Sequence, residues 1–201
     1  MSISGITKLL PYAAAALLGA QAVSFAARPT DDLLRPPGAQ DEKDFASKCI
    51  KCGRCIQACP YAALVPAGPN TGSAVGSPTL DVREQACRLC TDFPCIEACP
   101  TEALCAVEAI EDVNMGYAVI DEELCIALAG MRCEVCYRAC PLIDRAITID
   151  YRLREGDSIH SIFAPVIDQE ACVGCGLCVE RCVVSEPEVA IKIVRQDPER
   201  S

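Results

Sequence analysis

Cysteines at regular spacing dominate the chemistry that this sequence can perform. Sixteen of the 17 cysteines fall into four groups, each written as C-x2-C-x2-C-x3-C or as the same pattern with an insertion. The groups are Cys49, Cys52, Cys55 and Cys59; Cys87, Cys90, Cys95 and Cys99; Cys125, Cys133, Cys136 and Cys140; and Cys172, Cys175, Cys178 and Cys182. Because the first cysteines stand at 49, 87, 125 and 172, one unit repeats at steps of 38, 38 and 47 residues.

This spacing is typical of iron–sulfur ligation. C-x2-C-x2-C places three thiolates around one cubane cluster, and the fourth cysteine points to a neighbouring cluster. The stretch "MRCEVCYRACP" holds only three cysteines, and we expect Cys125, displaced upstream by an insertion, to be the fourth. The sequence therefore predicts four [4Fe-4S] clusters with sixteen cysteine ligands, and Cys105 is expected to pack as a small apolar side chain.

Other uses of cysteine fit the pattern poorly. Disulfide frameworks favour even counts and have no reason to repeat this spacing. Structural zinc sites use paired C-x2-C knuckles, often with histidine, whereas His160 is the chain's one histidine. No C-x-x-C is followed by His, as c-type haem attachment requires, and a Rieske centre needs two histidines.

The spacing leaves open which groups share their clusters. Groups one and four are compact whereas groups two and three carry insertions, so matching like with like predicts a nested pairing; sequential pairing is the alternative. The nested scheme gives four ligand sets: Cys49, Cys52, Cys55 and Cys182; Cys172, Cys175, Cys178 and Cys59; Cys87, Cys90, Cys95 and Cys140; and Cys125, Cys133, Cys136 and Cys99.

The composition indicates that the cysteines also stabilise the fold. The chain of 201 residues is only 4% aromatic, lacks tryptophan, and contains 14 prolines and 12 glycines. Such a chain buries little apolar surface, so bound metal would supply part of its stability. A net charge of −10 argues against nucleic-acid binding and suits a cationic redox partner, although acidity also simply favours solubility.

The elements that position the cysteines are expected to be short. Alternating stretches at 146–151 and 162–168 predict a β-hairpin, and the stretches at 117–121 and 189–194 fit the same scheme. Each x3-C-P segment suits a short helix that carries the fourth ligand. We therefore expect an α+β fold made of two ferredoxin-like two-cluster units.

The N-terminus differs from the rest of the chain. Residues 1–26 hold one charge, Lys8, and small residues at Ser24 and Ala26 mark a cleavage site, so this segment is interpreted as an export signal or an uncleaved anchor. Residues 27–44 are polar and proline-bearing and are interpreted as a linker, which leaves 45–201 as the four-cluster domain.

Several longer motifs resemble one family. "LLRPPGA", "CRLCTDFPCIEACPTEAL", "NMGYAVID" and "MRCEVCYRACPLIDRAIT" are similar to the NapG/MauM class of periplasmic ferredoxin-type proteins, from about Leu34 to Val194. The resemblance implies electron transfer from a membrane quinol-oxidising iron–sulfur partner to periplasmic acceptors such as c-type cytochromes, in nitrate reduction or in methylamine metabolism. Resemblance to four-cluster subunits of respiratory enzymes also implies the nested ligand scheme. No Arg-Arg pair precedes the apolar run, which departs from the twin-arginine signal expected of this class.

Three functional classes follow from these observations. The first is a non-catalytic electron carrier, because the chain offers no nucleophile–base pair, phosphate-binding glycine loop or open metal position. The second is a catalytic iron–sulfur enzyme, which would need a cluster lacking one protein ligand, whereas every group holds four cysteines. The third is a subunit of a cytoplasmic-facing oxidoreductase held by an uncleaved anchor.

Overall fold

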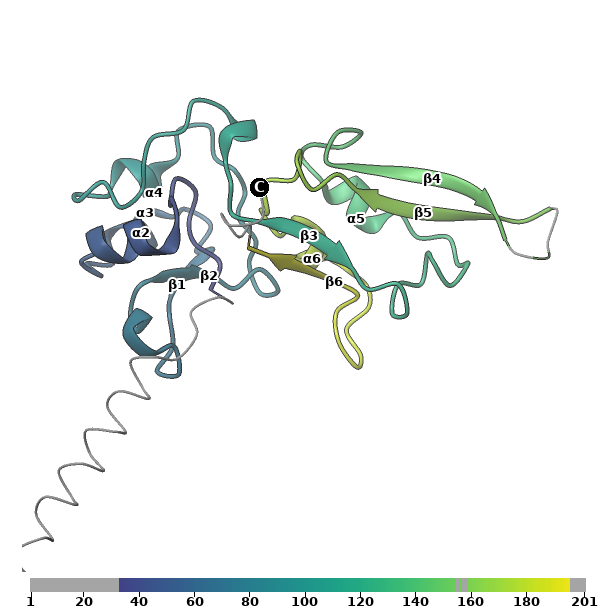
Figure 1. Cartoon of the computed structure of the whole chain (residues 1–201), viewed down its shortest axis with the longest axis horizontal. Coiled ribbons are helices and arrows are strands. Elements are labelled where there is room, and N and C mark those ends of the chain that lie inside the picture. Colours follow the sequence, from purple (N-terminus) through teal and green to yellow (C-terminus); the bar gives the residue numbers. More distant parts are fainter. Residues whose placement is uncertain (1–32, 155, 157–158, 196–201) are drawn as a thin grey trace, which may run out of the picture.

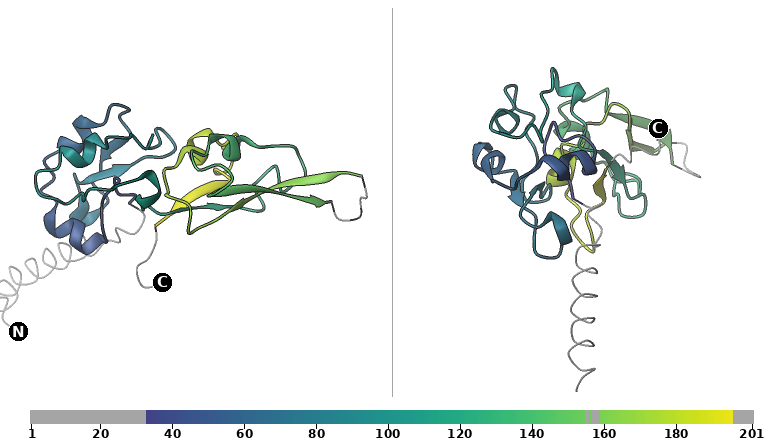
Figure 2. Two further views of the ribbon diagram at one scale, coloured as in Figure 1. Left: turned by 90° about the horizontal axis from the view of Figure 1, so that it is seen from above. Right: turned by 60° about the vertical axis from the view of Figure 1, so that its left-hand side comes forward.

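The computed structural model describes residues 33–154, 156 and 159–195, and these form two lobes (Figure 1). The first lobe contains helices α2 to α4 and strands β1 and β2. The second contains helices α5 and α6 with strands β3 and β6, and the β4–β5 hairpin projects from it (Figures 1 and 2). The mixture of short helices and short strands confirms the expected α+β class.

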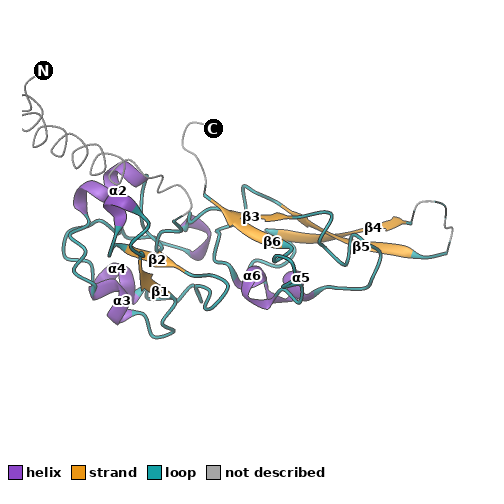
Figure 3. Cartoon of the chain, turned by 90° about the horizontal axis from the view of Figure 1, so that it is seen from below, coloured by secondary structure: helices purple, strands orange, loops and turns teal. Residues whose placement is uncertain are grey.

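Two short helices lie side by side in each lobe (Figure 3). They are α3 (Arg54–Ala58) and α4 (Pro94–Glu97) in the first lobe, and α5 (Val135–Ala139) and α6 (Leu177–Arg181) in the second. Each helix carries the third cysteine of its group, and the fourth cysteine follows at the C-terminal end. The prediction of a helix beside the fourth ligand is therefore confirmed, but that cysteine lies just past the helix.

Three two-stranded antiparallel sheets complete the fold. They are β1 (Leu64–Pro66) with β2 (Pro78–Leu80), β3 (Tyr117–Ile120) with β6 (Ile191–Val194), and β4 (Ile147–Leu153) with β5 (Ser161–Ile167). The hairpin predicted from the alternating stretches is confirmed as β4 and β5. Strands are also present where 117–121 and 189–194 were expected, and these two distant segments pair with each other. Strands β1 and β2 were not expected, because each is only three residues long and shows no alternating pattern.

The apolar core is small and reaches across both lobes. One cluster joins Leu64, Leu80 and Phe93 of the first lobe to Met115 and Val173 of the second. Phe45 and Ile147 are the largest non-proline side chains that are almost fully buried in the described chain, and many of the other buried residues are alanines. The core therefore connects the lobes without supplying large aromatic contacts.

The interpretation of residues 27–44 as a linker is wrong for its second half. Arg35 is only 4% exposed, its guanidinium pairs with Glu42, and it donates to Ser77 Oγ at 2.8 Å and to the carbonyl of Pro78 at 2.9 Å. Helix α2 (Glu42–Lys48) then begins at Asp41, whose carboxylate accepts the Asp44 amide. Tertiary contacts therefore hold residues 33–44 against the first lobe, although their polar composition predicted a linker.

The expected export signal at 1–26 lies outside the described residues. Within the described ranges, no helix is both long enough and apolar enough to cross a membrane.

Candidate functional site

Four cavities contain all sixteen grouped cysteines, with four cysteines lining each. Cavity A is lined by Cys49, Cys52, Cys55 and Cys99; cavity B by Cys59, Cys87, Cys90 and Cys95; cavity C by Cys140, Cys172, Cys175 and Cys178; and cavity D by Cys125, Cys133, Cys136 and Cys182. Their volumes, which include space open to solvent, are about 330, 360, 390 and 380 Å³ for A, B, C and D. The same lining of four cysteines indicates that all four suit the same kind of group.

This grouping shows that the nested pairing is wrong. Cavity A takes its fourth cysteine, Cys99, from group two, and cavity B takes Cys59 from group one. Groups three and four exchange Cys140 and Cys182 in the same way. Pairing is therefore sequential, because each lobe is built from two groups that are consecutive in the chain.

The short helices explain how one cysteine group serves two cavities. In α5, Cys136 faces cavity D from inside the helix, and Cys140 comes four residues later as the C-cap. The backbone of Cys140 is extended, with φ −74° and ψ 126°, so the chain leaves the helix there and its thiol reaches cavity C. Cys59 and Cys182 occupy the same C-cap position after α3 and α6.

Left-handed backbone shapes the turn between the first and second cysteines in three of the four groups. The residue before the second cysteine has positive φ in three groups: Lys51 at 55°, Leu89 at 51° and Gly174 at 70°. Such a turn curls the chain so that successive thiols can face one centre, and glycine adopts it without steric cost. Leu89 adopts it while buried in the core cluster, so packing holds its strained backbone in place.

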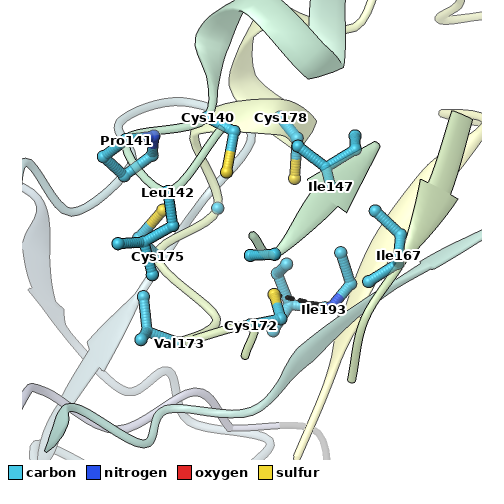
Figure 4. Close-up of a pocket in the computed structure, with 13 residues that line it drawn as sticks. Cys140, Pro141, Leu142, Ile147, Ile167, Cys172, Val173, Cys175, Cys178 and Ile193 are labelled. Atoms are coloured by element: carbon cyan, nitrogen blue, oxygen red, sulfur yellow. Dashed lines mark hydrogen bonds between the residues drawn. The ribbon is translucent and has the colours of Figure 1, made fainter. Parts of the chain in front are cut away.

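Figure 4 shows cavity C, with the sulfurs of its four cysteines directed inward. Apolar side chains such as Leu142, Ile147 and Ile167 fill the wall between them. The Ala118 amide donates a hydrogen bond to Cys172 Sγ at 3.4 Å, and the Ala63 amide donates to Cys59 Sγ of cavity B at the same distance. Amide donors of this kind stabilise negative charge on sulfur and tune the reduction potential of a bound cluster.

Burial strongly raises the pKa of several cavity thiols. It raises the pKa of Cys95, Cys136 and Cys175 to about 12, and that of Cys55 and Cys87 to about 11. Burial is the largest cause, and neighbouring cysteines of the same cavity add to it. These five thiols are therefore protonated in the iron-free chain at neutral pH, and iron binding must displace the protons.

Cys99 is the exception. Burial raises the pKa of its thiol, but the backbone N–H groups of Thr101, Leu104 and Ala103 and the Thr101 hydroxyl together lower it below the usual value. The loop after α4 thus directs donors at this sulfur and favours its thiolate.

The donor set fits a [4Fe-4S] cluster. Four soft thiolates in an apolar cavity are the ligands that such a cluster requires. In the described part of the chain, no three Cys, His, Asp or Glu side chains converge closely enough to hold a single metal ion. Each cavity offers four cysteines, one for each iron of such a cluster.

Cys105 lines none of the four cavities, as expected. Its amide donates to the Gly38 carbonyl at 2.8 Å, and its thiol lies 3.8 Å from the Glu102 carbonyl. The sequence did not predict that the Ala63 and Ala118 amides donate hydrogen bonds to cysteine sulfurs. Almost every residue type has a backbone N–H, so residue type does not mark such a donor.

Comparisons with known proteins agree with this geometry. A "4Fe-4S dicluster domain" matches residues 48–103 and again 125–185, which are groups one with two and groups three with four. Two such domains imply four [4Fe-4S] clusters, as the cysteine count predicts.

The chain is 43% identical over 167 residues to "Ferredoxin-type protein NapG" of Escherichia coli, covering 82% of this chain and 72% of the relative. It is 38% identical over 166 residues to "Methylamine utilization ferredoxin-type protein MauM" of Paracoccus denitrificans, with the same coverage. The chain belongs to the NapG and MauM family of ferredoxin-type iron–sulfur electron carriers.

Proposed function

We propose that this chain conducts electrons along four [4Fe-4S] clusters, one in each of cavities A to D, from a membrane quinol-oxidising partner to a periplasmic acceptor. The observation that carries the proposal is the division of sixteen cysteines into four cavities of four. A cluster bound in such a cavity supplies one-electron transfer. On this scheme the ligands of each cluster are the four cysteines that line its cavity.

The order of the cavities supports a single path. A and B share helices α3 and α4, because Cys55 and Cys59 flank the end of α3 but face different cavities. C and D share α5 and α6 in the same way. B and C meet between the lobes, where the Cys87 amide donates to the Cys175 carbonyl at 3.0 Å. The cavities therefore form a linear series A–B–C–D, which ends at cavity A in the first lobe and at cavity D in the second.

The ligand count supports a non-catalytic role. A cluster that binds substrate needs an iron without a protein ligand, and each cavity offers four thiols. Cavity A has the most accessible edge, since Cys52 is the exposed member of the seventeen cysteines. We infer that one partner meets the chain beside Cys52 and the other beside cavity D.

We place the chain in the periplasm because its motifs resemble the NapG/MauM class, and the relatives it matches suggest two branches of metabolism. Similarity to proteins named NapG favours a periplasmic nitrate reductase system, with a c-type cytochrome or similar acceptor, and an export signal within residues 1–26 would deliver the chain there. Similarity to proteins named for methylamine utilization favours the second candidate, electron transfer in methylamine oxidation. Identity is 43–44% to the first set and 38% to the second, so we place the nitrate branch first.

A redox titration of anaerobically purified protein tests the proposal. We expect about 16 iron atoms and uptake of about four electrons per chain, one for each cluster. Oxidised c-type cytochrome added to the reduced protein should withdraw all of them. Iron near 8, or clusters that accept electrons but deliver none to the cytochrome, would contradict the proposal. Deletion of the gene, followed by growth on nitrate and on methylamine, separates the two branches.

A further inference from the structure

Charged side chains bridge the two lobes where cavities B and C meet. Arg83, which follows β2 in the first lobe, donates from Nη1 to the carbonyls of Val179 at 2.8 Å, Cys182 at 3.1 Å and Glu180 at 3.4 Å. These carbonyls belong to the last turn and cap of α6, where most carbonyls lack an intrahelical donor. The Val179 carbonyl also accepts the Cys182 amide at 3.2 Å, so Arg83 adds a second donor there. Arg83 thus holds the backbone next to Cys178, which lines cavity C, and that of Cys182, which lines cavity D.

Glu180 makes the reverse contact from the second lobe. Its carboxylate accepts the Ala86 amide at 2.7 Å and the Arg88 guanidinium at 2.8 Å. Ala86 and Arg88 flank Cys87, which lines cavity B. The Glu180 side chain is 13% exposed and that of Arg88 is 24% exposed, so water competes little for these bonds.

The backbones between these two contacts approach closely. The Cys87 amide donates to the Cys175 carbonyl across the junction. A Cβ added at Gly176 would lie 2.4 Å from Val82 Cγ1, so only glycine fits beside Val82 at this point. The junction therefore brings a cysteine of cavity B next to a cysteine of cavity C.

We propose that Arg83 and Glu180 form a reciprocal clasp, a pair of positioning residues that fixes the separation of cavities B and C for electron transfer between the lobes. This inference rests on the proposed function. Tunnelling rates fall steeply with distance, and two lobes joined by a small interface move relative to each other unless specific contacts fix them. Arg83 binds the α6 backbone beside Cys178 and Cys182, and Glu180 binds the backbone amide beside Cys87. The two contacts therefore fix the positions of cysteines in both lobes relative to each other.

The test uses the iron-loaded full chain with Arg83→Met and Glu180→Gln. Because the apolar cluster also spans the junction, we expect both variants to fold and keep their iron. Two signals should change: the Cys87 amide should lose its protection from hydrogen exchange, and the fully reduced protein should lose the spin–spin interaction between the lobes in its EPR spectrum. Arg83→Lys keeps a donor at the α6 carbonyls and should restore both signals in part.

Glu134→Gln is the matched control. Glu134 precedes α5, its side chain is 14% exposed, and it pairs with Arg132 and Arg138 within its own lobe. It should leave the Cys87 amide protected and the inter-lobe interaction intact. The clasp proposal would be overturned if Arg83→Met and Glu180→Gln, at full iron content, kept the protection of the Cys87 amide and the spin–spin interaction between the lobes. It would also be overturned if Glu134→Gln lost both signals to the same extent. Low iron in the unmodified protein would instead contradict the four-cluster proposal.

Discussion

At the scale of single residues, the sulfurs are held by their backbone surroundings as well as by their spacing. Cys59 and Cys172 accept amide hydrogen bonds, and Cys99 lies among several backbone donors. Burial raises the pKa of several cavity thiols, Cys95, Cys136 and Cys175 among them, which disfavours the thiolate until iron replaces the proton. The cavities are thus built for a bound group and are poor sites for free, reactive thiols.

Cys125 and Cys105 provide a test at this scale. Cys125→Ser should remove one cluster, about 4 of about 16 iron atoms, because oxygen is a poorer partner for iron than thiolate. Cys105→Ser should leave the iron content unchanged, since Cys105 lines no cavity. Iron analysis with low-temperature EPR distinguishes the two. A cluster lost in Cys105→Ser and kept in Cys125→Ser would show that Cys105 is the ligand.

At the scale of elements, four short helices determine how the cysteine groups are connected. Each sends its third cysteine to one cavity and its fourth, just past the helix end, to the neighbouring cavity. The helices are only four or five residues long, too short to be stable by themselves. They are kept in place by packing in pairs around the cavities.

Double substitutions test the sequential pairing. Cys49→Ala with Cys99→Ala removes two ligands of cavity A alone, so about 12 iron atoms should remain. Cys49→Ala with Cys182→Ala affects cavities A and D, so about 8 should remain. Iron and acid-labile sulfide analysis measures both. The nested scheme expects the two values to be exchanged, so the pair of variants decides between the schemes.

The segment before α2 gives a second prediction for an element. Arg35 lies over the Phe45 ring, 4.7 Å from its centroid, and pairs with Glu42 while almost fully buried. Arg35→Ala should destabilise the iron-loaded protein by about 1–3 kcal/mol, because buried acceptors at Ser77 and Pro78 lose their donor. Glu42, by contrast, keeps Arg195 as a partner. Anaerobic urea denaturation measures the shift.

Lys48→Ala is the matched control on the same helix. Lys48 pairs with Asp44 at 2.8 Å, but both side chains are well exposed to solvent, so the denaturation midpoint should hardly change. Equal midpoints for Arg35→Ala and the unmodified protein would restore the interpretation of this segment as a linker.

At the scale of the whole molecule, the two lobes contain little apolar core. An apolar cluster and the hydrogen bonds of Arg83 and Glu180 join them. The core cluster that spans them consists of small and medium side chains around the cysteines of cavities B and C. Four cavities replace much of the interior that aromatic side chains would otherwise fill. We therefore expect the bound clusters to contribute to folding as well as to electron transfer.

Iron removal tests this dependence on the clusters. The chelated, reduced chain should lose most of its circular dichroism and its cooperative melt, because thiols in empty cavities neither crosslink the groups nor fill the space between them. Reconstitution with iron and sulfide should restore both. A sharp thermal transition of the iron-free chain with native-like circular dichroism would contradict this expectation.

The sequence by itself determined the number and kind of cofactors. Ligand spacing is a local property, so C-x2-C-x2-C identified each cluster motif, and the two dicluster domain matches confirm four clusters. Cys125 was assigned correctly to the third group by the same repeat, since it shares cavity D with Cys133 and Cys136. The β4–β5 hairpin was also predictable, because its alternation is local.

Only the tertiary structure decided which groups share cavities. Cys59, Cys99, Cys140 and Cys182 each point away from their own motif, and nothing in the spacing states which motif they meet. Similar insertions suggested a nested partner, whereas consecutive groups close shorter loops and fold into one lobe. The ordered segment around Arg35 and the clasp between Arg83 and Glu180 were hidden for the same reason, because their partners lie far along the chain.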